Sequence, residues 1–407
     1  MRRLRNAAVA LLLLLALAAA LVLWALPPRI DAAMNTVAGD GLPPVPPQAR
    51  DLHASLALVD LHADPLLWQR DLLARSDRGH VDLPRLREGR VALQVFGVVT
   101  HSPAGQNYER TSADAPDRIT WLALAQAWPP RTWRSRFERA RHQAAKLAGF
   151  AERSDGGLVL VRSAADLEGL RSARQAAPGP DPASPVGALL AIEGLHAMDG
   201  RLENLDALYA AGFRMMAPTH FFDNALGGSA AGEAKGGLTE LGRAAVRRMD
   251  ALGVVIDLAH ASPRTVDDVL DRTANPVVVS HTGVQATCPG PRNLSDAQLR
   301  RIAAGGGVVG IGVWEGAVCG IAPADVARAM RHVRDTVGID HVALGTDFDG
   351  TVHTAFDATG LAMVTAALLD AGFTEEEVRK AMGGNALRVL ARVLPGGDES
   401  SIAVGAR

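Results

Sequence analysis

The chain has 407 residues, of which 48% are hydrophobic and 21% are charged, a composition typical of a folded globular protein rather than a disordered one. Lysine and arginine total 42, against 44 for aspartate and glutamate. The chain therefore lacks the basic excess that would hold a phosphate backbone, and we expect no nucleic-acid partner. Its two cysteines exclude a disulfide-rich scaffold and a four-thiolate zinc site.

The N-terminus begins with a basic segment and continues with an apolar one. Arg2, Arg3 and Arg5 precede an uncharged apolar run over residues 7–26, which is 20 residues long. As a helix, a run of this length crosses the hydrocarbon core of a bilayer, which is about 30 Å thick. Because positive charges stay on the cytoplasmic side, we expect the rest of the chain on the periplasmic or other extracytoplasmic side. A membrane-anchoring helix over residues 1–26 is predicted, with a cleaved signal peptide as the alternative.

Three further segments follow this run. Six prolines between positions 27 and 47 disfavour regular structure, so residues 27–50 are predicted to form a stiff linker outside the fold. Residues 51–395 are predicted to form one folded domain, with a surface loop at residues 178–185. Residues 396–407 are predicted to be a flexible tail.

The predicted domain alternates short apolar runs with helix-like segments. The apolar runs are rich in Val, Ile and Leu and nearly continuous, as strands of a parallel sheet buried on both faces should be. Eight such strands are predicted: Leu56–Asp64, Val91–Thr100, Val186–Gly194, Phe213–His220, Gly253–His260, Pro276–Thr282, Gly306–Val313 and His341–Gly350.

Helices are predicted between these strands. Helical apolar spacing with a charged opposite face predicts helices over Glu240–Leu252 and Ala324–Val337. Ser262, Ser295 and Thr374 are predicted to cap the starts of three more.

The order of these elements indicates the fold class. Eight strands alternating with helices predict an α/β fold, a (β/α)8 TIM-like barrel, with extra helices in the long connection over residues 102–185. An open doubly wound sheet is the alternative, but no Gly-x-Gly-x-x-Gly motif follows a predicted strand.

Titratable residues gather at the ends of the predicted strands. In a (β/α)8 barrel the active site forms at the carboxyl ends of the strands, from residues on several of them. Structural histidines scattered through a fold would not be expected to favour that face. The residues placed there are His62, Asp64, Glu193, His220, His260, His281, Asp347 and Asp349.

Five of these residues suit a dinuclear zinc site. His62 and Asp64 are two apart on a strand and therefore face the same way, so both can bind one ion. Glu193 ends an apolar run, where a carboxylate has to be paired, liganded or solvated, and its two oxygens can bridge two ions. His260 and His281 end adjacent strands and suit a second ion. A single salt bridge at Glu193 and buried structural histidines are the plainer alternatives.

In this order, the motifs resemble those of the membrane dipeptidases, a family of dinuclear zinc peptidases built on an amidohydrolase-like barrel. The resemblance extends from about Asp51 to Leu394. The matching segments are Val59–Asp64, Gly79–Leu86, Ile192–His196, Thr219-His220 with Asn224, Gly237–Thr239, Asp257–Ser262, Ser280-His281, Arg292-Asn293, Gly345–Gly350 and Gly384–Arg388.

The resemblance implies a complete set of metal ligands. His62 and Asp64 are expected to bind one zinc ion, and His260 and His281 the other. Glu193 is expected to bridge the two ions together with a hydroxide.

The resemblance also implies roles for residues that bind no metal. His220 is expected to hold the scissile carbonyl oxygen, and Arg292 the C-terminal carboxylate of the substrate. Asp347 is expected to carry a proton from the attacking water to the leaving amine. A disulfide between Cys288 and Cys319 is expected from similar spacing in the family, in an oxidising compartment.

Some positions depart from the family pattern or are interpreted as structural. Leu61, Ala63 and Leu195 replace residues that are usually Gly, Asn and Gly, and no tyrosine is found near Trp314, so the residues around the ligands and the substrate preference are expected to differ. His196 is expected to orient a ligand. Structural roles are expected for His80, Asp82 and Asp349, and surface positions for His53, His142 and His332.

The implied activity is the hydrolysis of dipeptides with a free C-terminal carboxylate, including those with a D-residue at that position. A related amidohydrolase acting on a lactone, cyclic amide or phosphoester is one alternative. It is disfavoured because such enzymes commonly carry His-x-His on the first strand and a bridging lysine on the fourth, where this chain has His-x-Asp and His220. A catalytically inactive, membrane-tethered binding protein is the other alternative, although all five ligands are present. The oligomeric state, with a homodimer as one option, is left open.

Overall fold

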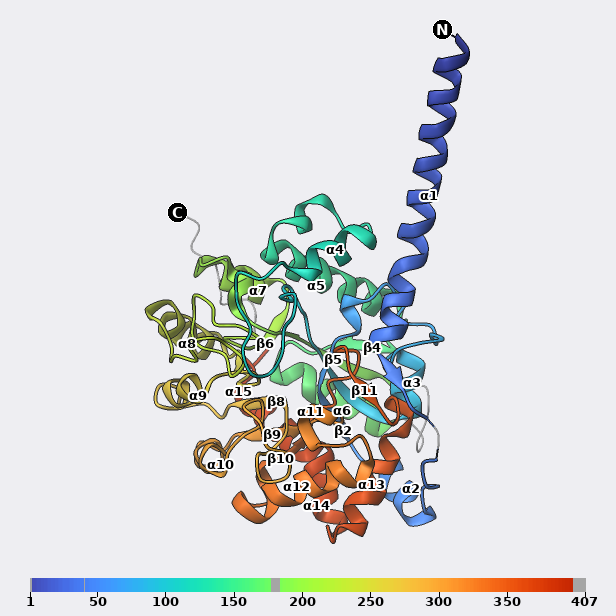
Figure 1. The fold of residues 1–407 in the computed structure, drawn as a ribbon. Helices are drawn as coiled ribbons and strands as arrows, with labels where there is room; N and C mark the ends of the chain where they lie inside the picture. Colours follow the sequence, from blue (N-terminus) through green and yellow to red (C-terminus); the bar gives the residue numbers. More distant parts are fainter. Residues whose placement is uncertain (1, 40, 177–183, 398–407) are drawn as a thin grey trace.

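A computed structural model describes residues 2–39, 41–176 and 184–397 of the chain. Figure 1 shows a body of strands and helices from which one long N-terminal helix projects. Most of the loop predicted at residues 178–185, and nearly all of the tail predicted at residues 396–407, lie outside the described residues.

The centre of the body is built from parallel strands. Each of the eight predicted strands is confirmed, although each is shorter than its apolar run, and one short strand between the second and third was not predicted. The strands are β2 (Leu58–Ala63), β3 (Val91–Phe96), β4 (Leu158–Leu160), β5 (Val186–Ile192), β6 (Phe213–Met216), β7 (Val255–Ile256), β8 (Val278–Thr282), β9 (Val308–Ile311) and β10 (Val342–Leu344).

The strands follow one another in space in nearly the order of the chain. One sheet has the order β2-β3-β5-β6-β7, with β4 pairing with β5 from outside this path, and the other has the order β8-β9-β10. Every pair is parallel. Single parallel bridges, Asp257 with Val278 and Ala63 with Phe348, join the two sheets on both sides. The arrangement is an α/β fold consistent with the predicted TIM-like barrel.

Alternation along the strands separates the two larger hydrophobic clusters of the core. Val59, Leu61, Leu93 and Val95 belong to one cluster, to which β5 to β10 also contribute and against which α15 packs. Leu58 and Phe96 belong to the larger cluster, which also contains the apolar faces of the surrounding helices. Successive strand residues point to opposite faces, so strands buried on both faces need an almost unbroken apolar sequence.

Helices surround the strands (Figure 1). The helix predicted over Glu240–Leu252 has these bounds, and the one predicted from Ala324 begins one residue earlier. The helices are α1 (Arg2–Met34), α2 (Pro47–Ala54), α3 (Leu83–Glu88), α4 (Arg118–Ala125), α5 (Arg136–Arg153), α6 (Ala164–Ala176), α7 (Glu203–Ala210), α8 (Glu240–Leu252), α9 (Pro263–Leu270), α10 (Asp296–Ala304), α11 (Glu315–Val318), α12 (Pro323–Val337), α13 (Leu361–Asp370), α14 (Glu375–Arg379) and α15 (Asn385–Val393).

The predicted caps and the extra helices are confirmed. The hydroxyls of Ser262, Ser295 and Thr374 accept hydrogen bonds from the backbone N–H groups three residues later, and the last two form capping boxes. The long connection between the second and third predicted strands contains α4, α5 and α6. Side-chain caps satisfy N–H groups that a helix leaves unpaired, so Ser and Thr at these positions mark the helix starts in the sequence.

The linker prediction is wrong for much of its length. Helix α1 continues through Pro27 and Pro28 to Met34, and the chain then forms a strand, β1 (Thr36–Val37), parallel to β11 (His353–Thr354). Prolines normally break a helix because they lack a backbone N–H, but here the last turns of α1 are held by contacts with the folded domain. Pro47 occupies the first position of α2, where proline is favoured.

Among the described residues, no helix is both long enough and apolar enough to cross a membrane, so helix hydropathy does not support the predicted anchor.

The prediction that His53 lies at the surface is wrong. Its ring is buried, Nδ1 lies 2.9 Å from the hydroxyl of Thr365 and Nε2 lies 3.1 Å from the carbonyl oxygen of Gly89. Burial lowers the pKa of His53 to about 4, so the ring is neutral at pH 7.

Candidate active site

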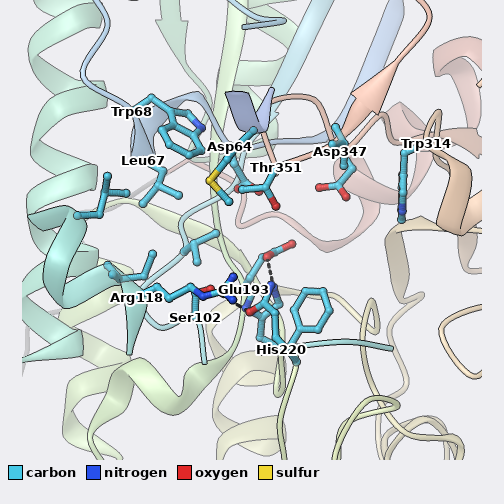
Figure 2. A pocket seen from close by; sticks show the side chains of 18 of the residues that line it. Asp64, Leu67, Trp68, Ser102, Arg118, Glu193, His220, Trp314, Asp347 and Thr351 are labelled. Atoms are coloured by element: carbon cyan, nitrogen blue, oxygen red, sulfur yellow. Dashed lines mark hydrogen bonds and ion pairs between the residues drawn. The ribbon is translucent and has the colours of Figure 1, made fainter. Parts of the chain in front are cut away.

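A cavity of about 820 Å³ opens at the carboxyl ends of the strands. Its lining includes seven of the residues singled out in the sequence: Asp64, Glu193, His220, His260, Arg292, Trp314 and Asp347. Figure 2 shows Asp64, Glu193, His220 and Asp347 pointing toward one another from different elements. The convergence follows from the fold, because parallel strands bring all their carboxyl ends to one face.

Glu193 stands at the centre of the site, directly after β5. Its Oε1 lies 2.7 Å from Nε2 of His62, 3.3 Å from Nε2 of His281 and 3.9 Å from Nε2 of His260. Its Oε2 lies 2.7 Å from Nε2 of His220. One carboxylate therefore contacts or approaches imidazoles from four different strands or strand ends.

His62 and Asp64 lie on the same side of the site at the end of β2. Nε2 of His62 is 3.4 Å from Oδ2 of Asp64. The backbone of Gly97, just after β3, passes so close that a Cβ there would lie 2.3 Å from Oδ1 of Asp64 and 2.7 Å from Cε1 of His62. The position therefore requires glycine, a constraint that the sequence analysis did not identify.

His260 and His281 come from neighbouring strand ends. Their Nε2 atoms are 3.0 Å apart, and Nδ1 of His281 is 2.9 Å from the hydroxyl of Ser280. That hydroxyl donates to Oδ2 of Asp257 at 2.6 Å. A chain of hydrogen bonds behind His281 thus fixes its ring and leaves Nε2 directed into the site, as is common behind metal-binding histidines.

The electrostatics favour neutral rings at His260 and His281 and an ionised carboxylate at Glu193. Burial would lower the pKa of His62, but the carboxylates of Glu193 and Asp64 outweigh it and raise that pKa well above the usual range. Burial lowers the pKa values of His260 and His281 well below the usual range, and Arg292 lowers both further. Burial alone would raise the pKa of Glu193, but the charges of His220 and His62 outweigh it and hold that pKa well below the usual range. Neutral imidazole nitrogens and ionised carboxylates are the forms that bind metal ions.

Several buried polar atoms at this site have no hydrogen-bond partner of good geometry among the described residues. They include Nδ1 and Nε2 of His62, Oδ1 of Asp64 and Oε1 of Glu193, and the 2.7 Å approach of Nε2 of His62 to Oε1 of Glu193 is an ion-pair contact without hydrogen-bond geometry. In the described part of the chain, donor atoms within 4.8 Å of one another form three groups: His62, Glu193 and His281; Glu193, His220 and His260; and His62, Asp64 and Asp347. Buried polar atoms normally have partners, and nitrogen and carboxylate donors are those that zinc prefers. The residues therefore fit divalent cations, with Glu193 common to two of the groups.

Arg292 reaches the same cavity from the loop after β8. Its Nη2 donates a hydrogen bond to the carbonyl oxygen of His281 at 2.7 Å. The same atom lies 3.3 Å from Nε2 of His260. The guanidinium carbon is 5.7 Å from the centre of the Trp314 ring. Its Nε is buried and has no hydrogen-bond partner among the described residues. A fixed guanidinium with a free N–H group is suited to bind a carboxylate.

Asp347 lies beside the metal-binding groups, in the segment after β10. Its backbone has φ = 61°, and its side chain is partly buried. Burial raises the pKa of Asp347 well above the usual range, and the charges of Asp64 and Glu193 raise it further, against the opposite effects of His62 and Arg292. A carboxyl group with a raised pKa is suited to exchange protons near neutral pH.

The neighbouring Asp349 has a structural role, as predicted. Its Oδ1 accepts from the backbone N–H of His80 at 2.7 Å, and its Oδ2 lies 2.8 Å from Nη2 of Arg70. Burial would raise the pKa of Asp349, but Arg70 and His80 outweigh it and lower that pKa to about 2. His196 differs from its expected role, because its Nε2 contacts the hydroxyl of Thr100 at 2.9 Å rather than a predicted ligand.

A tyrosine that the sequence analysis missed also lines the cavity. Tyr108 lies in the loop between β3 and α4, and its hydroxyl accepts a hydrogen bond from Nε1 of Trp314 at 2.9 Å. Its ring stacks on Phe221 with 5.8 Å between the ring centres. No motif marks this loop, and tertiary contacts with Trp314 and Phe221 place Tyr108 at the site.

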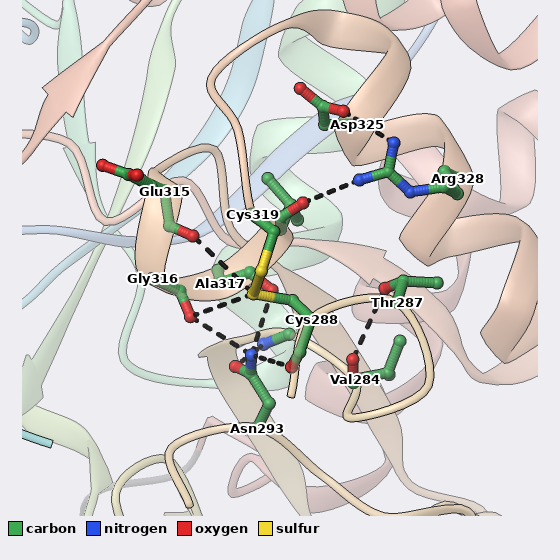
Figure 3. Close-up of a disulfide and its surroundings, with 12 residues drawn as sticks. Val284, Thr287, Cys288, Asn293, Glu315, Gly316, Ala317, Cys319, Asp325 and Arg328 are labelled. Carbon is green, nitrogen blue, oxygen red and sulfur yellow. Dashed lines mark hydrogen bonds and ion pairs between the residues drawn. A yellow bond between two sulfur atoms is a disulfide. The ribbon is translucent and has the colours of Figure 1, made fainter. Parts of the chain in front are cut away.

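The predicted disulfide between Cys288 and Cys319 is confirmed, with 5.2 Å between the Cα atoms (Figure 3). It joins the loop after β8 to the end of α11. The side-chain amide of Asn293 supports the same junction, donating to the carbonyl oxygens of Cys288 at 2.8 Å and Ala317 at 3.2 Å. Because Asn293 follows Arg292 directly, the disulfide and the hydrogen bonds of Asn293 hold Arg292 in place.

Removing this bond is expected to lower stability. The double substitution Cys288→Ser and Cys319→Ser releases a loop of 31 residues, which we expect to lower the free energy of unfolding by about 3–4 kcal/mol. Urea unfolding of the oxidised full chain and of the variant measures the difference. Reduction of the unmodified protein should cause most of the same fall in unfolding free energy. Equal stability with and without reductant would contradict the prediction.

A family model for membrane dipeptidases, described as peptidase family M19, matches residues 47–396. Dipeptidase tcpJ of Claviceps purpurea is 29% identical over 356 residues, which cover 84% of this chain and 75% of that protein. An uncharacterized protein of Klebsiella pneumoniae, encoded in the pqqA 5′ region, is 33% identical over 267 residues, 62% of this chain and 94% of its own length.

Solved structures agree with this match. A metallopeptidase of Rhodobacter sphaeroides, liganded with a phosphinate mimic of the dipeptide L-Ala-D-Ala, has a TM-score of 0.66 and 26% identity, covering 83% of this chain and 99% of the other. The structure of a dipeptidase described as "dipeptidase AC", of the same peptidase family, has a TM-score of 0.67 and 26% identity, covering 84% and 99%.

Proposed function

Because the chain belongs to the membrane dipeptidase family, peptidase family M19, we propose that it hydrolyses dipeptides that carry a free C-terminal carboxylate. This proposal is carried by one observation: the buried guanidinium of Arg292 lies in the same cavity as Glu193, and its Nε has no hydrogen-bond partner in the part of the chain that the structure describes. A buried, fixed cation beside a group of metal-binding residues is what recognition of a short peptide by its terminal carboxylate requires.

The proposed cofactor is a pair of zinc ions. We assign His62 and Asp64 to one ion and His260 and His281 to the other, with Glu193 in contact with both. The sequence motifs and the 3.0 Å between the Nε2 atoms of His260 and His281 support this division, although the donor groups also place His220 beside Glu193 and His260. When bound, zinc supplies a Lewis acid that polarises a peptide carbonyl and makes water a nucleophile near neutral pH.

The side chains of the chain supply the remaining steps. His220, whose ring is held 2.7 Å from Glu193, is placed to donate to the carbonyl oxygen as negative charge develops on it. Asp347 takes the proton that the attacking water loses and returns it to the amine as the C–N bond breaks. Arg292 holds the carboxylate, so that the peptide bond lies over the cluster of imidazoles.

The proposed substrates include dipeptides with a D-residue at the C-terminal position. This proposal is supported by the related metallopeptidase of Rhodobacter sphaeroides, whose structure contains a mimic of L-Ala-D-Ala.

We further propose that the catalytic domain lies on the extracytoplasmic side of a membrane and is tethered there by the N-terminal segment. Arg2, Arg3 and Arg5 before an apolar run, together with the Cys288–Cys319 bond, support that location.

A panel of peptides tests the proposed function with the full chain. It contains L,L and L,D dipeptides, a tripeptide and a C-terminally amidated dipeptide, each assayed after chelation and after zinc is added back. Cleavage of the free dipeptides alone, restored by zinc, supports the proposal. A zinc-bound protein that cleaves no peptide would contradict it and favour a lactone, cyclic amide or phosphoester as substrate.

Arg292→Gln is expected to raise KM for free dipeptides about 10- to 100-fold, because a charge-assisted hydrogen bond contributes about 1.5–3 kcal/mol. The amidated dipeptide should be an equally poor substrate for the variant and the parent. Arg118 lines the same cavity and is exposed, so Arg118→Gln serves as the matched control with little change in KM. A large rise in KM for Arg118→Gln and none for Arg292→Gln would contradict the prediction and indicate that the substrate carboxylate binds to Arg118 on the other side of the cavity.

A further inference from the structure

The last turns of α1 form one wall of the active-site cavity. Leu26, Ile30 and Met34 are spaced four residues apart, so they lie on one face of the helix, and all three line the cavity. Leu67 and Leu122 also line the cavity. Ile30 and Leu122 also pack against the small apolar cluster that contains Leu67. Ile30 and Met34, from the predicted linker, and Leu26, from the predicted anchor, thus line the active-site cavity.

The wall is attached to the segments that carry catalytic groups. Asp31 is buried, and its Oδ2 lies 3.0 Å from Nε of Arg70 and 3.1 Å from Nε of Arg78. Arg70 in turn pairs with Asp349, two residues after Asp347. A buried carboxylate requires such partners, so the end of α1 is fixed in position relative to the site.

Asn35 adds a second attachment. Its amide donates to Oδ1 of Asp31 at 2.9 Å, and its Oδ1 accepts from the backbone N–H of Thr351 at 2.9 Å. Directly after it, β1 pairs in parallel with β11. Two hydrogen-bonded contacts therefore join the end of α1 to the segment that follows Asp347.

The wall lies on the opposite side of the cavity from the carboxylate-binding arginine. Figure 2 shows Leu67, Trp68 and Arg118 on one side of Glu193 and Trp314 on the other. Arg292 packs beside Trp314. A dipeptide with its carboxylate on Arg292 and its peptide bond at Glu193 therefore directs its N-terminal residue toward the wall.

Much of this wall is apolar surface that the protein itself does not bury. The side chains of Leu26 and Met34 are 42% and 37% exposed, and that of Trp121, which also lines the cavity, is 70% exposed. A side chain that covered such surface would gain from the removal of apolar area from water. A small N-terminal residue such as alanine would leave it uncovered.

We propose that Leu26, Ile30 and Met34 of α1, together with α4, form a binding subsite for a large apolar side chain on the N-terminal residue of the substrate. The inference rests on the proposed dipeptidase function and adds a substrate class to it. Preferred substrates are dipeptides that begin with leucine or phenylalanine, and the N-terminal helix determines this preference.

Kinetics with the full chain test the proposal. For the parent protein, kcat/KM for L-Leu-L-Ala and L-Phe-L-Ala is expected to exceed that for L-Ala-L-Ala at least about tenfold. Ile30→Ala and Met34→Ala should each lower this ratio several-fold. Val37→Ala is the matched control, because Val37 follows in the same segment, is 38% exposed and does not line the cavity.

A variant that fills the proposed subsite, rather than enlarging it, provides a second test. Ile30→Trp keeps an apolar side chain at the wall but occupies the space, so it should reduce kcat/KM for L-Phe-L-Ala more than for L-Ala-L-Ala. Equal effects of all variants on the large and small substrates, or a parent protein without preference, would overturn the subsite and leave the dipeptidase function standing. Failure of the zinc-bound parent to cleave any dipeptide would overturn the function and the subsite with it.

Discussion

Replacing Glu193 by glutamine is expected to abolish dipeptide hydrolysis and to remove metal from the protein. The carboxylate contacts His62 and His220 at 2.7 Å through different oxygens. Glutamine keeps the shape but loses the negative charge, and its NH2 group donates where a metal ligand has to accept. Metal-assisted hydrolysis depends on several kcal/mol of charge stabilisation, so we expect kcat/KM to fall at least about a thousandfold.

The measurement combines metal content with kinetics. The purified parent should contain close to two zinc ions per chain and Glu193→Gln at most one, after both have been dialysed against the same zinc concentration. Glu315→Gln is the matched control, because Glu315 lines the same cavity but its side chain is exposed and lies in no group of metal-binding residues among those described. Full zinc content and near-normal activity in Glu193→Gln would contradict the role of Glu193.

The residues at the strand ends were predictable because their positions follow from the fold. An apolar run long enough for a doubly buried strand sets where the strand ends, and parallel strands bring those ends together. His62, Glu193, His260 and His281 converge for this reason, although no two of them are neighbours in the sequence. The metal-binding cluster was therefore implied once the strands had been identified.

Residues whose positions depend on tertiary contacts were not predictable. Tyr108 reaches the cavity from an irregular loop, where its hydrogen bond with Trp314 and its stacking on Phe221 place it. The path of the chain after Pro27 depends on Asp31, whose partners Arg70 and Arg78 are some forty residues away in the sequence. Local propensity indicates a break at paired prolines, and the buried ion pairs outweigh that propensity.

Asp347→Asn is expected to lower kcat about 10²- to 10⁴-fold, the range for loss of a general acid–base group. KM should change little, because Arg292 rather than Asp347 holds the substrate. The substitution is suited to the backbone, since Asp347 has φ = 61° and asparagine adopts this conformation more readily than most residues. A loss of kcat in this variant therefore reports on proton transfer rather than on a distorted loop.

Two further measurements separate this role from the alternatives. Zinc content should be unchanged in Asp347→Asn, whereas a fall would make Asp347 a metal ligand with His62 and Asp64. Asp349→Asn provides the contrast, because Asp349 pairs with Arg70 inside the protein, and weakening a buried pair is expected to cost about 3 kcal/mol of stability. Substitutions at these two aspartates, which are two residues apart, should therefore have different effects. Asp347→Asn lowers kcat in a protein of normal stability, whereas Asp349→Asn lowers the unfolding free energy and nearly retains kcat.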